Sequence, residues 1–218
     1  MSNRVVGAYR KYAKNYDFAV KLYRLLGIKI GKYRDITVDS LDLSKGDTVV
    51  ELGCGTGLNF SRVLDKIGTE GKLIGVDITD KMLDQARKRI DEKGWKNVEL
   101  VESDFAKYKF PQEIDGIFTT GALQYSTQYD KIIKQGHDAL KPNKKFVIMD
   151  FKMSQGPAKI FAPLIVFFTK PFGADEEYLK GTAWKSIEKY FEKNSYREGW
   201  GGFLYVSVGT KIQDNVSF

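Results

Sequence analysis

An apolar strand and a glycine loop share the segment Val49-Val50-Glu51-Leu52-Gly53-Cys54-Gly55-Thr56-Gly57. The apolar run at residues 48–52 predicts a buried parallel strand, and residues 59–67 predict the helix that follows it. Glycine at every second position allows a sharp backbone turn and leaves room for a ligand against it. The free N–H groups at the start of the helix face this loop. The segment therefore predicts an α/β fold with a nucleotide-type ligand at the loop.

The spacing of the glycines narrows the class of ligand. A dinucleotide fingerprint has the pattern G-x-G-x-x-G and a phosphate-binding P-loop ends in G-K-[ST], whereas Leu58 follows the third glycine here. Glu51 at the end of the strand repels phosphate and attracts a positive charge. The pattern therefore disfavours a pyrophosphate or triphosphate and favours a cationic ligand.

Acidic residues also end the next two predicted strands. Residues 72–77 predict the second strand, and Asp77 lies about twenty residues beyond the loop, where an acid reaches ribose hydroxyls in nucleotide-binding α/β folds. Residues 97–101 predict the third strand, and Asp104 follows it closely. Three acids in this order and spacing indicate a nucleoside site along one edge of the sheet.

These features resemble the class I, Rossmann-like methyltransferases, which take a methyl group from S-adenosylmethionine (SAM) and release S-adenosylhomocysteine. The resemblance covers roughly residues 9–211. It implies an α/β three-layer sandwich with a seven-stranded, mostly parallel sheet and an antiparallel last strand. Residues 115–123 resemble the strand and loop beside the transferred methyl group, and residues 144–151 resemble the fifth strand.

The resemblance also implies roles for individual residues. In the family, the acid equivalent to Glu51 faces the methionine amino group, and the acid equivalent to Asp104 accepts a hydrogen bond from the adenine amino group. The predicted SAM-binding residues are Tyr16, Glu51, Gly53, Cys54, Gly55, Thr56, Gly57, Asp77, Ile78, Met82, Asp104, Phe105, Thr120 and Gly121. An amine acceptor must lose a proton, and the candidate catalytic groups, chosen by location, are Tyr16, Tyr125 and Asp150.

Composition predicts one globular domain, and the resemblance implies that it is a methyltransferase domain at residues 35–218, preceded by an arm. A length of 218 residues with 42% apolar content suits a single α/β sheet. The start has no apolar core of the signal-peptide kind, and the single cysteine permits no internal disulfide, so we expect a cytoplasmic protein. With one histidine, one cysteine and no clustered ligands, we expect no metal site.

Positive charge is concentrated in residues 1–34, the N-terminal arm. The arm has nine basic residues and one acid, a formal charge of +8, so the rest of the chain sums to −1 against a total of +7. At roughly 100° per residue, one helical face gathers Tyr9, Tyr12, Tyr16, Val20, Tyr23 and Leu26. The other face gathers Arg10, Lys11, Lys14, Lys21 and Arg24. This amphipathic pattern predicts a lid over the SAM pocket, an element that binds the anionic inner face of a membrane peripherally, or both. The near-neutral remainder disfavours nucleic acid as a partner.

Two segments near the C-terminus bear on the methyl acceptor. Residues 157–168 are apolar but too short and proline-broken to span a bilayer, which predicts either the wall of an acceptor pocket or a helix packed on the sheet. Residues 182–193 predict a helix, and residues 196–208 predict a closing hairpin that turns at residues 201–202.

The closing strand is similar to that of quinone C-methyltransferases and bacterial phospholipid N-methyltransferases, and residues 12–17 resemble their Tyr-Asp motif. We therefore expect transfer to a small hydrophobic or lipid acceptor, with a phospholipid amine ahead of a quinone ring carbon. The alternatives are a non-catalytic SAM-binding regulator and an RNA or protein methyltransferase.

Overall fold

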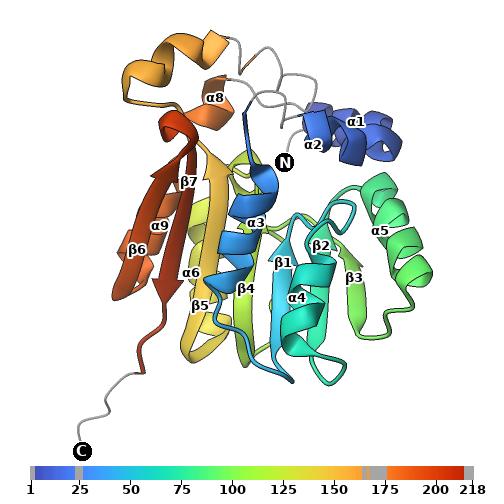
Figure 1. Ribbon diagram of the computed structural model, residues 1–218. Helices are drawn as coiled ribbons and strands as arrows, with labels where there is room; N and C mark the ends of the chain where they lie inside the picture. Colours follow the sequence, from blue (N-terminus) through green and yellow to red (C-terminus); the bar gives the residue numbers. More distant parts are fainter. Residues whose placement is uncertain (1–2, 23–26, 164–165, 167–175, 214–218) are drawn as a thin grey trace, which may run out of the picture.

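The computed structural model describes residues 3–22, 27–163, 166 and 176–213. Figure 1 shows a seven-stranded sheet with helices on both faces and the N-terminal helices across one end. The strands are β1 (Thr48–Leu52), β2 (Lys72–Asp77), β3 (Val98–Glu102), β4 (Ile114–Thr120), β5 (Leu140–Phe151), β6 (Lys193–Gly199) and β7 (Leu204–Thr210). The α-helices are α1 (Asn3–Tyr12), α2 (Tyr16–Leu22), α3 (Ile30–Asp39), α4 (Phe60–Ile67), α5 (Asp80–Lys93), α6 (Tyr129–Ala139), α8 (Glu176–Leu179) and α9 (Ala183–Tyr190). The predicted α/β class and seven-stranded sheet are confirmed.

The strand order is β3-β2-β1-β4-β5-β7-β6, and strands β1 to β5 pair in parallel. Strand β7 runs antiparallel to both of its neighbours, as predicted for the last strand. The order reverses direction between β1 and β4, and ligands of open α/β sheets bind at the carboxyl ends of the strands at such a point. The glycine loop after β1 and the loop after β4 therefore lie side by side.

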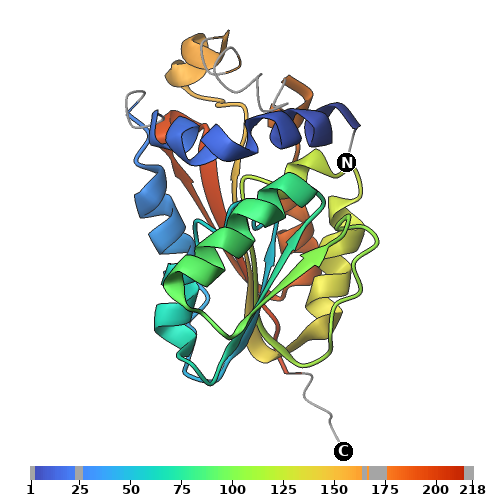
Figure 2. The same ribbon diagram turned by 90° about the vertical axis from the view of Figure 1, so that its right-hand side faces the viewer.

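The sheet is buried on both faces. Val49 packs with α3, α4 and α5, whereas Val50 packs in the opposite core with α6 and α9. Figures 1 and 2 show these two helical layers on either side of the strands. Both faces of β1 and β4 are covered, so nearly every residue of these strands is buried, rather than every second one.

The hairpin at the C-terminal edge differs in its boundaries from the prediction. Helix α9 ends at Tyr190, and β6 begins at Lys193, inside the range predicted as helix. Six of the seven residues of β6 are exposed, so this edge strand lacks the apolar pattern that marks a strand. The turn lies where predicted, with Gly201 and Gly202 both at positive φ.

The arm is not one continuous helix. A 3-10 turn at Ala13–Asn15 separates α1 from α2, and α3 crosses the boundary predicted after residue 34 to pack on the sheet. The predicted faces hold in the described part of the arm, where Tyr9, Tyr16 and Val20 are at least half-buried. The basic residues of the other face are exposed, namely Arg10, Lys11, Lys14 and Lys21. Residues 23, 24 and 26 of these faces lie outside the described residues.

The apolar segment after β5 begins with a short 3-10 helix, Pro157–Phe161. Ile160 and Phe161 are 76% and 56% exposed, so this part does not pack on the sheet. Residues 164–165 and 167–168 of the segment lie outside the described residues. Within the described ranges, no helix combines the length and apolar character needed to cross a membrane.

Candidate active site

The glycine loop connects β1 to α4 in a conformation that depends on glycine. Gly53, Gly55 and Gly57 have φ values of 75°, 54° and 77°, which L side chains rarely adopt. The N–H groups of Gly53 and Cys54 both donate to the carbonyl of Val76 in β2, at 2.8 and 3.1 Å. These bonds anchor the loop to the neighbouring strand.

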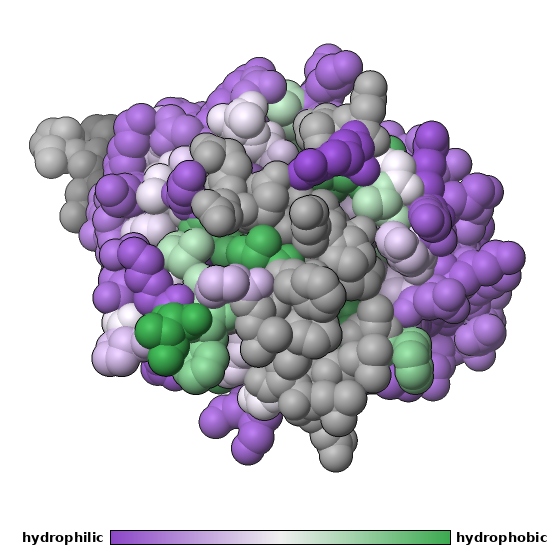
Figure 3. Space-filling model, turned by 90° about the horizontal axis from the view of Figure 1, so that it is seen from above, coloured by the Kyte–Doolittle hydropathy of each residue, from purple (hydrophilic) through white to green (hydrophobic). Residues whose placement is uncertain are grey.

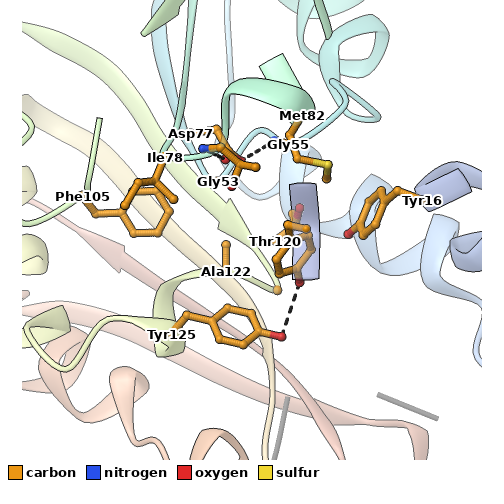
Figure 4. Close-up of a pocket in the computed structure, with 13 residues that line it drawn as sticks. Tyr16, Gly53, Gly55, Asp77, Ile78, Met82, Phe105, Thr120, Ala122 and Tyr125 are labelled. Carbon is orange, nitrogen blue, oxygen red and sulfur yellow. Dashed lines mark hydrogen bonds between the residues drawn. The ribbon is translucent and has the colours of Figure 1, made fainter. Parts of the chain in front are cut away.

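A pocket opens between this loop, the ends of β2 and β4, and the arm. Figure 4 shows Phe105 and Tyr16 on opposite sides of it, with Thr120 and Ala122 between them. Its lining residues are Tyr9, Tyr16, Gly53, Gly55, Asp77, Ile78, Thr79, Met82, Phe105, Thr120, Gly121, Ala122 and Tyr125. We call this the donor pocket.

Asp77 joins the floor of the donor pocket to the glycine loop. One carboxylate oxygen accepts from Gly55 N–H at 2.9 Å, and the other accepts from Thr79 N–H at 2.8 Å. Burial raises the pKa of Asp77, and these backbone hydrogen bonds oppose the rise. A carboxylate oxygen has two lone pairs and can accept two hydrogen bonds, so Asp77 can also accept from a ligand hydroxyl.

Glu51 begins a buried polar network beneath the loop. Asn59 Nδ2 donates to Glu51 Oε1 at 2.5 Å and to Thr120 Oγ1 at 3.0 Å. The other oxygen of Glu51, Oε2, is buried without a hydrogen-bond partner. Burial raises the pKa of Glu51 to about 8, against the opposing effect of Asn59 and Arg34. An orphaned carboxylate oxygen of this kind suits a cationic donor group such as an ammonium.

A second pocket shares one wall with the donor pocket. The shared residues are Tyr9, Tyr16, Thr120, Gly121 and Tyr125. The remaining walls are Val20, Ile30, Arg34, Met149, Phe151 and Tyr178. We call this the acceptor pocket, because two ligands bound side by side would meet at the shared wall.

Tyrosines of the arm and of the loop after β4 form that shared wall, and Tyr178 of α8 lies next to them in the acceptor pocket. The Tyr9 hydroxyl of the arm donates a hydrogen bond to the Tyr125 hydroxyl, with the two oxygens 3.4 Å apart. The rings of Tyr9 and Tyr16 pack together, with their centroids 5.8 Å apart. The Tyr125 ring stacks on Tyr178, with centroids 4.4 Å apart. Behind them, the Tyr178 hydroxyl donates to Asp150. Burial raises the pKa of Asp150 to about 6, against the opposing hydrogen bonds from Tyr178 and backbone N–H groups.

The arm is held over the donor pocket by polar contacts. Asp17, the one acid of the arm, accepts from the hydroxyl of Thr56 at 2.6 Å and pairs with Arg89 of α5. Arg10 pairs with Asp80 at the start of α5, at 2.7 Å. The arm therefore lies across the end of the sheet where the donor pocket opens (Figure 2), and its Tyr9 and Tyr16 line that pocket.

The structure places the predicted SAM-binding residues in two groups. Tyr16, Gly53, Gly55, Asp77, Ile78, Met82, Phe105, Thr120 and Gly121 line the donor pocket, as does the catalytic candidate Tyr125. The predicted SAM-binding residues that do not line the donor pocket are Glu51, Cys54, Thr56, Gly57 and Asp104. The catalytic candidate Asp150 does not line it either.

Specific contacts account for the second group. The buried thiol of Cys54 faces Gly75 of β2, and burial holds its pKa well above the usual value, so it is a filler and not a nucleophile. Gly57 fits against the Phe60 ring, which lies 2.6 Å from where a Cβ would stand. Asp104 accepts from Ala106 N–H at 2.9 Å, beside Phe105 in the wall.

Sequence reasoning missed four residues that build the site. Arg34 was counted only as part of the arm's charge, and Asn59 only as the start of a helix. Tyr9 was assigned only to the inner face of the arm, and nothing in the local sequence distinguishes Tyr178. Their roles depend on contacts between segments far apart in the chain.

The residues present fit SAM. Gly53 and Gly55 form a cradle that side chains would fill, since a Cβ on Gly53 would lie 2.3 Å from Ala122 Cβ and one on Gly55 3.2 Å from Met82 Cε. The orphaned Glu51 oxygen suits its ammonium group. In the described part of the chain, no group of three or more His, Cys, Asp or Glu side chains is placed to hold a metal ion.

Comparison with known proteins places the chain in a family. A family described as "Methyltransferase domain" matches residues 43–194. The demethylmenaquinone methyltransferase of Bacillus velezensis is 25% identical, over 95% of this chain and 97% of its own. That of Listeria welshimeri is 26% identical over 67% of this chain, and the match spans only 62% of the Listeria protein.

A solved structure has the same fold. Phosphoethanolamine N-methyltransferase 2 of Haemonchus contortus, in complex with S-adenosylhomocysteine, superposes with a TM-score of 0.66. The match covers 84% of this chain and 53% of that one at 16% identity. The chain belongs to the methyltransferase domain family, and it has a Rossmann-like methyltransferase fold.

Proposed function

We propose that the protein transfers a methyl group from SAM to a ring carbon of a hydroquinone with an apolar tail. The observation that carries the proposal is the acceptor pocket, which shares five residues with the donor pocket and is otherwise lined by apolar and aromatic side chains and by Arg34. A flat ring fits between aromatic side chains in offset or edge-on contact. Relatives named as demethylmenaquinone methyltransferases, aligned over nearly the whole chain, support this acceptor class.

The chain's own residues position the reactants. SAM supplies a methyl group already activated by its sulfonium. The shared tyrosines and Thr120 hold the acceptor against that methyl group and exclude water. Burial raises the pKa of Tyr16, so its phenol stays protonated at neutral pH and donates a hydrogen bond to an acceptor oxygen. Asp150 does not line either pocket and acts through Tyr178, as a positioning residue.

One observation favours a phospholipid amine as the second candidate. Tyr9, Tyr16, Tyr125 and Tyr178 surround the acceptor pocket, and aromatic faces attract ammonium groups. The Arg34 guanidinium in the same wall repels an ammonium, which is why the hydroquinone comes first.

Parallel assays with two different acceptors test the proposal. The purified protein is incubated with SAM carrying a deuterated methyl group and with either a reduced naphthoquinone with a prenyl tail or phosphatidylethanolamine, both in detergent. We expect the label on the quinol ring, by mass spectrometry, with release of S-adenosylhomocysteine. Label on the amine alone would reject the hydroquinone in favour of the second candidate.

Tyr16→Phe is expected to lower kcat about 3- to 10-fold at saturating SAM, the loss of one hydrogen bond of roughly 0.5–1.5 kcal/mol to the acceptor. The matched control is Tyr12→Phe, on the same arm but outside both pockets, which we expect to stay within twofold of the wild type. Equal rates for the two variants, measured with the labelled methyl group, would remove Tyr16 from the mechanism.

We also propose that the arm end of the molecule binds an anionic membrane, from which an apolar acceptor would be taken up. Phe18, Ile160 and Phe161 are exposed at this end, and Lys11 and Lys14 are exposed with them. In Figure 3, which views this end, green hydrophobic side chains interrupt the purple hydrophilic rim.

Replacing Lys11 and Lys14 by alanine is expected to weaken binding to vesicles containing phosphatidylglycerol by about 30-fold, since each lysine near an anionic surface contributes roughly 1 kcal/mol. Co-sedimentation over a salt series measures it. The matched control is the double variant Lys93→Ala and Lys96→Ala, at and just after the C-terminal end of α5, the end opposite to the one that Arg10 of the arm contacts. Equal losses in both pairs would contradict a role for the arm.

A further inference from the structure

Arg34 is a buried cation at the junction of the two pockets. It lies on α3, is 8% exposed, and lines the acceptor pocket together with Thr120, which lines both pockets. Its Nη1 donates to Asn59 Oδ1 at 2.9 Å and to Thr120 Oγ1 at 3.2 Å. Its Nε is buried and makes no hydrogen bond.

The hydrogen-bond partners of Arg34 are neutral. Asn59, Thr120 and the phenol of Tyr16, which also hydrogen-bonds Arg34, carry no charge, and no ion pair joins Arg34 to a carboxylate among the residues that the structure describes. Asn59 separates the guanidinium from Glu51, because its amide bonds Arg34 through the oxygen and Glu51 through the nitrogen. A buried charge without a hydrogen-bonded counter-ion is costly, whereas an Arg fork binds an anionic oxygen well.

We propose that Arg34 binds an anionic oxygen where the two pockets meet. Two ligands can supply it: the methionine carboxylate of SAM, or an ionised hydroxyl of the acceptor. If SAM supplies the oxygen, the two charges of its methionine part bind to one hydrogen-bond network, which Asn59 connects. Glu51 then binds the ammonium group and Arg34 binds the carboxylate. The second stabilises the phenolate that makes a ring carbon nucleophilic, and this part rests on the proposed function.

The test compares Arg34→Gln with Arg87→Gln, an exposed arginine of α5 that pairs with Asp84 on the surface. Calorimetry gives the Kd of SAM and of decarboxylated SAM, which keeps the ammonium and lacks the carboxylate. Steady-state kinetics give KM and kcat for the quinol. Loss of a charge-assisted hydrogen bond of roughly 1.5–3 kcal/mol predicts an effect of at least tenfold.

Each outcome decides the proposal. If Arg34→Gln weakens SAM at least tenfold and leaves decarboxylated SAM within twofold, the anion is the donor's carboxylate. If both donors bind normally but kcat/KM for the quinol falls at least tenfold, it is the acceptor's oxygen. Normal values for both donors and for the quinol overturn the proposal. So does equal loss of both donors in a folded variant.

Two further measurements test the proposal even if Arg34→Gln does not fold or if the quinol does not react. Arg34→Lys keeps the charge and should retain part of the affinity that Arg34→Gln loses. Wild-type protein alone should bind SAM at least tenfold more tightly than decarboxylated SAM if the carboxylate is the ligand. These binding measurements need no acceptor, so a failed quinol assay does not affect them.

Discussion

Gly53→Ala is expected to weaken SAM binding by on the order of 100-fold or more. A Cβ at this position would stand 2.3 Å from Ala122 Cβ, so the loop after β1 and the loop after β4 must separate. The φ of 75° adds strain of about 1–2 kcal/mol for an L residue, and the steric overlap adds about 1–3 kcal/mol. Both loops line the donor pocket, so the displacement acts directly on the ligand. Calorimetric titration with SAM measures the loss, and chemical unfolding measures the destabilisation.

Gly46→Ala is the matched control for this substitution. Gly46 has a φ of 86°, but nothing lies within 4 Å of a Cβ built there, and it does not line the donor pocket. It should lose about 1–2 kcal/mol of stability from strain and keep the wild-type Kd for SAM. If the two variants bound SAM equally well, the close approach of the two loops would not be part of the site.

The affinity for SAM is expected to rise with pH, up to about tenfold per unit below pH 8. Burial raises the pKa of Glu51 from 4.5 to about 8, so the ligand-free folded protein holds a proton there that the unfolded chain has released. Stability of the free protein therefore falls as pH rises from about 4.5 to 8. A bound ammonium favours the ionised carboxylate, so SAM binding releases this proton and strengthens as pH rises through that window.

Glu51→Gln should abolish this pH dependence and weaken SAM about 10- to 100-fold at pH 7.5, the loss of a charge-assisted hydrogen bond. The amide still accepts from Asn59, which preserves the network. Calorimetry in buffers of different ionisation enthalpy counts the protons released, and Glu188→Gln on the exposed face of α9 is the control. The same pH slope in wild type and Glu51→Gln would show that Glu51 does not face the ammonium.

The sheet and the loop could be predicted because their signals are local. Residues 49–57 contain both the buried strand and the turn glycines, and the acids at 77 and 104 follow strands of ordinary apolar character. Residue type is informative about backbone conformation at these positions, since positive φ favours glycine and buried strands favour apolar residues.

The acceptor side could not be predicted, because it is built from distant segments. Arg34, Asn59 and Thr120 meet through hydrogen bonds that span up to 86 residues of chain. The break in the arm at Ala13–Asn15 is also tertiary in origin, since the helical periodicity continues through it. Arg10 before the break pairs with Asp80 of α5, and Asp17 after it pairs with Arg89 of α5. Asp150 is a catalytic candidate by its location in the sequence, yet its carboxylate accepts a hydrogen bond from Tyr178 and lines neither pocket.

Mass spectrometry of quinones and phospholipids from cells with and without the protein tests the proposed acceptor most directly. We expect cells without it to accumulate a quinone lighter by one CH2 unit and to keep their phospholipids unchanged. An unchanged quinone pool, with loss of N-methylated phosphatidylethanolamine, would contradict the hydroquinone proposal.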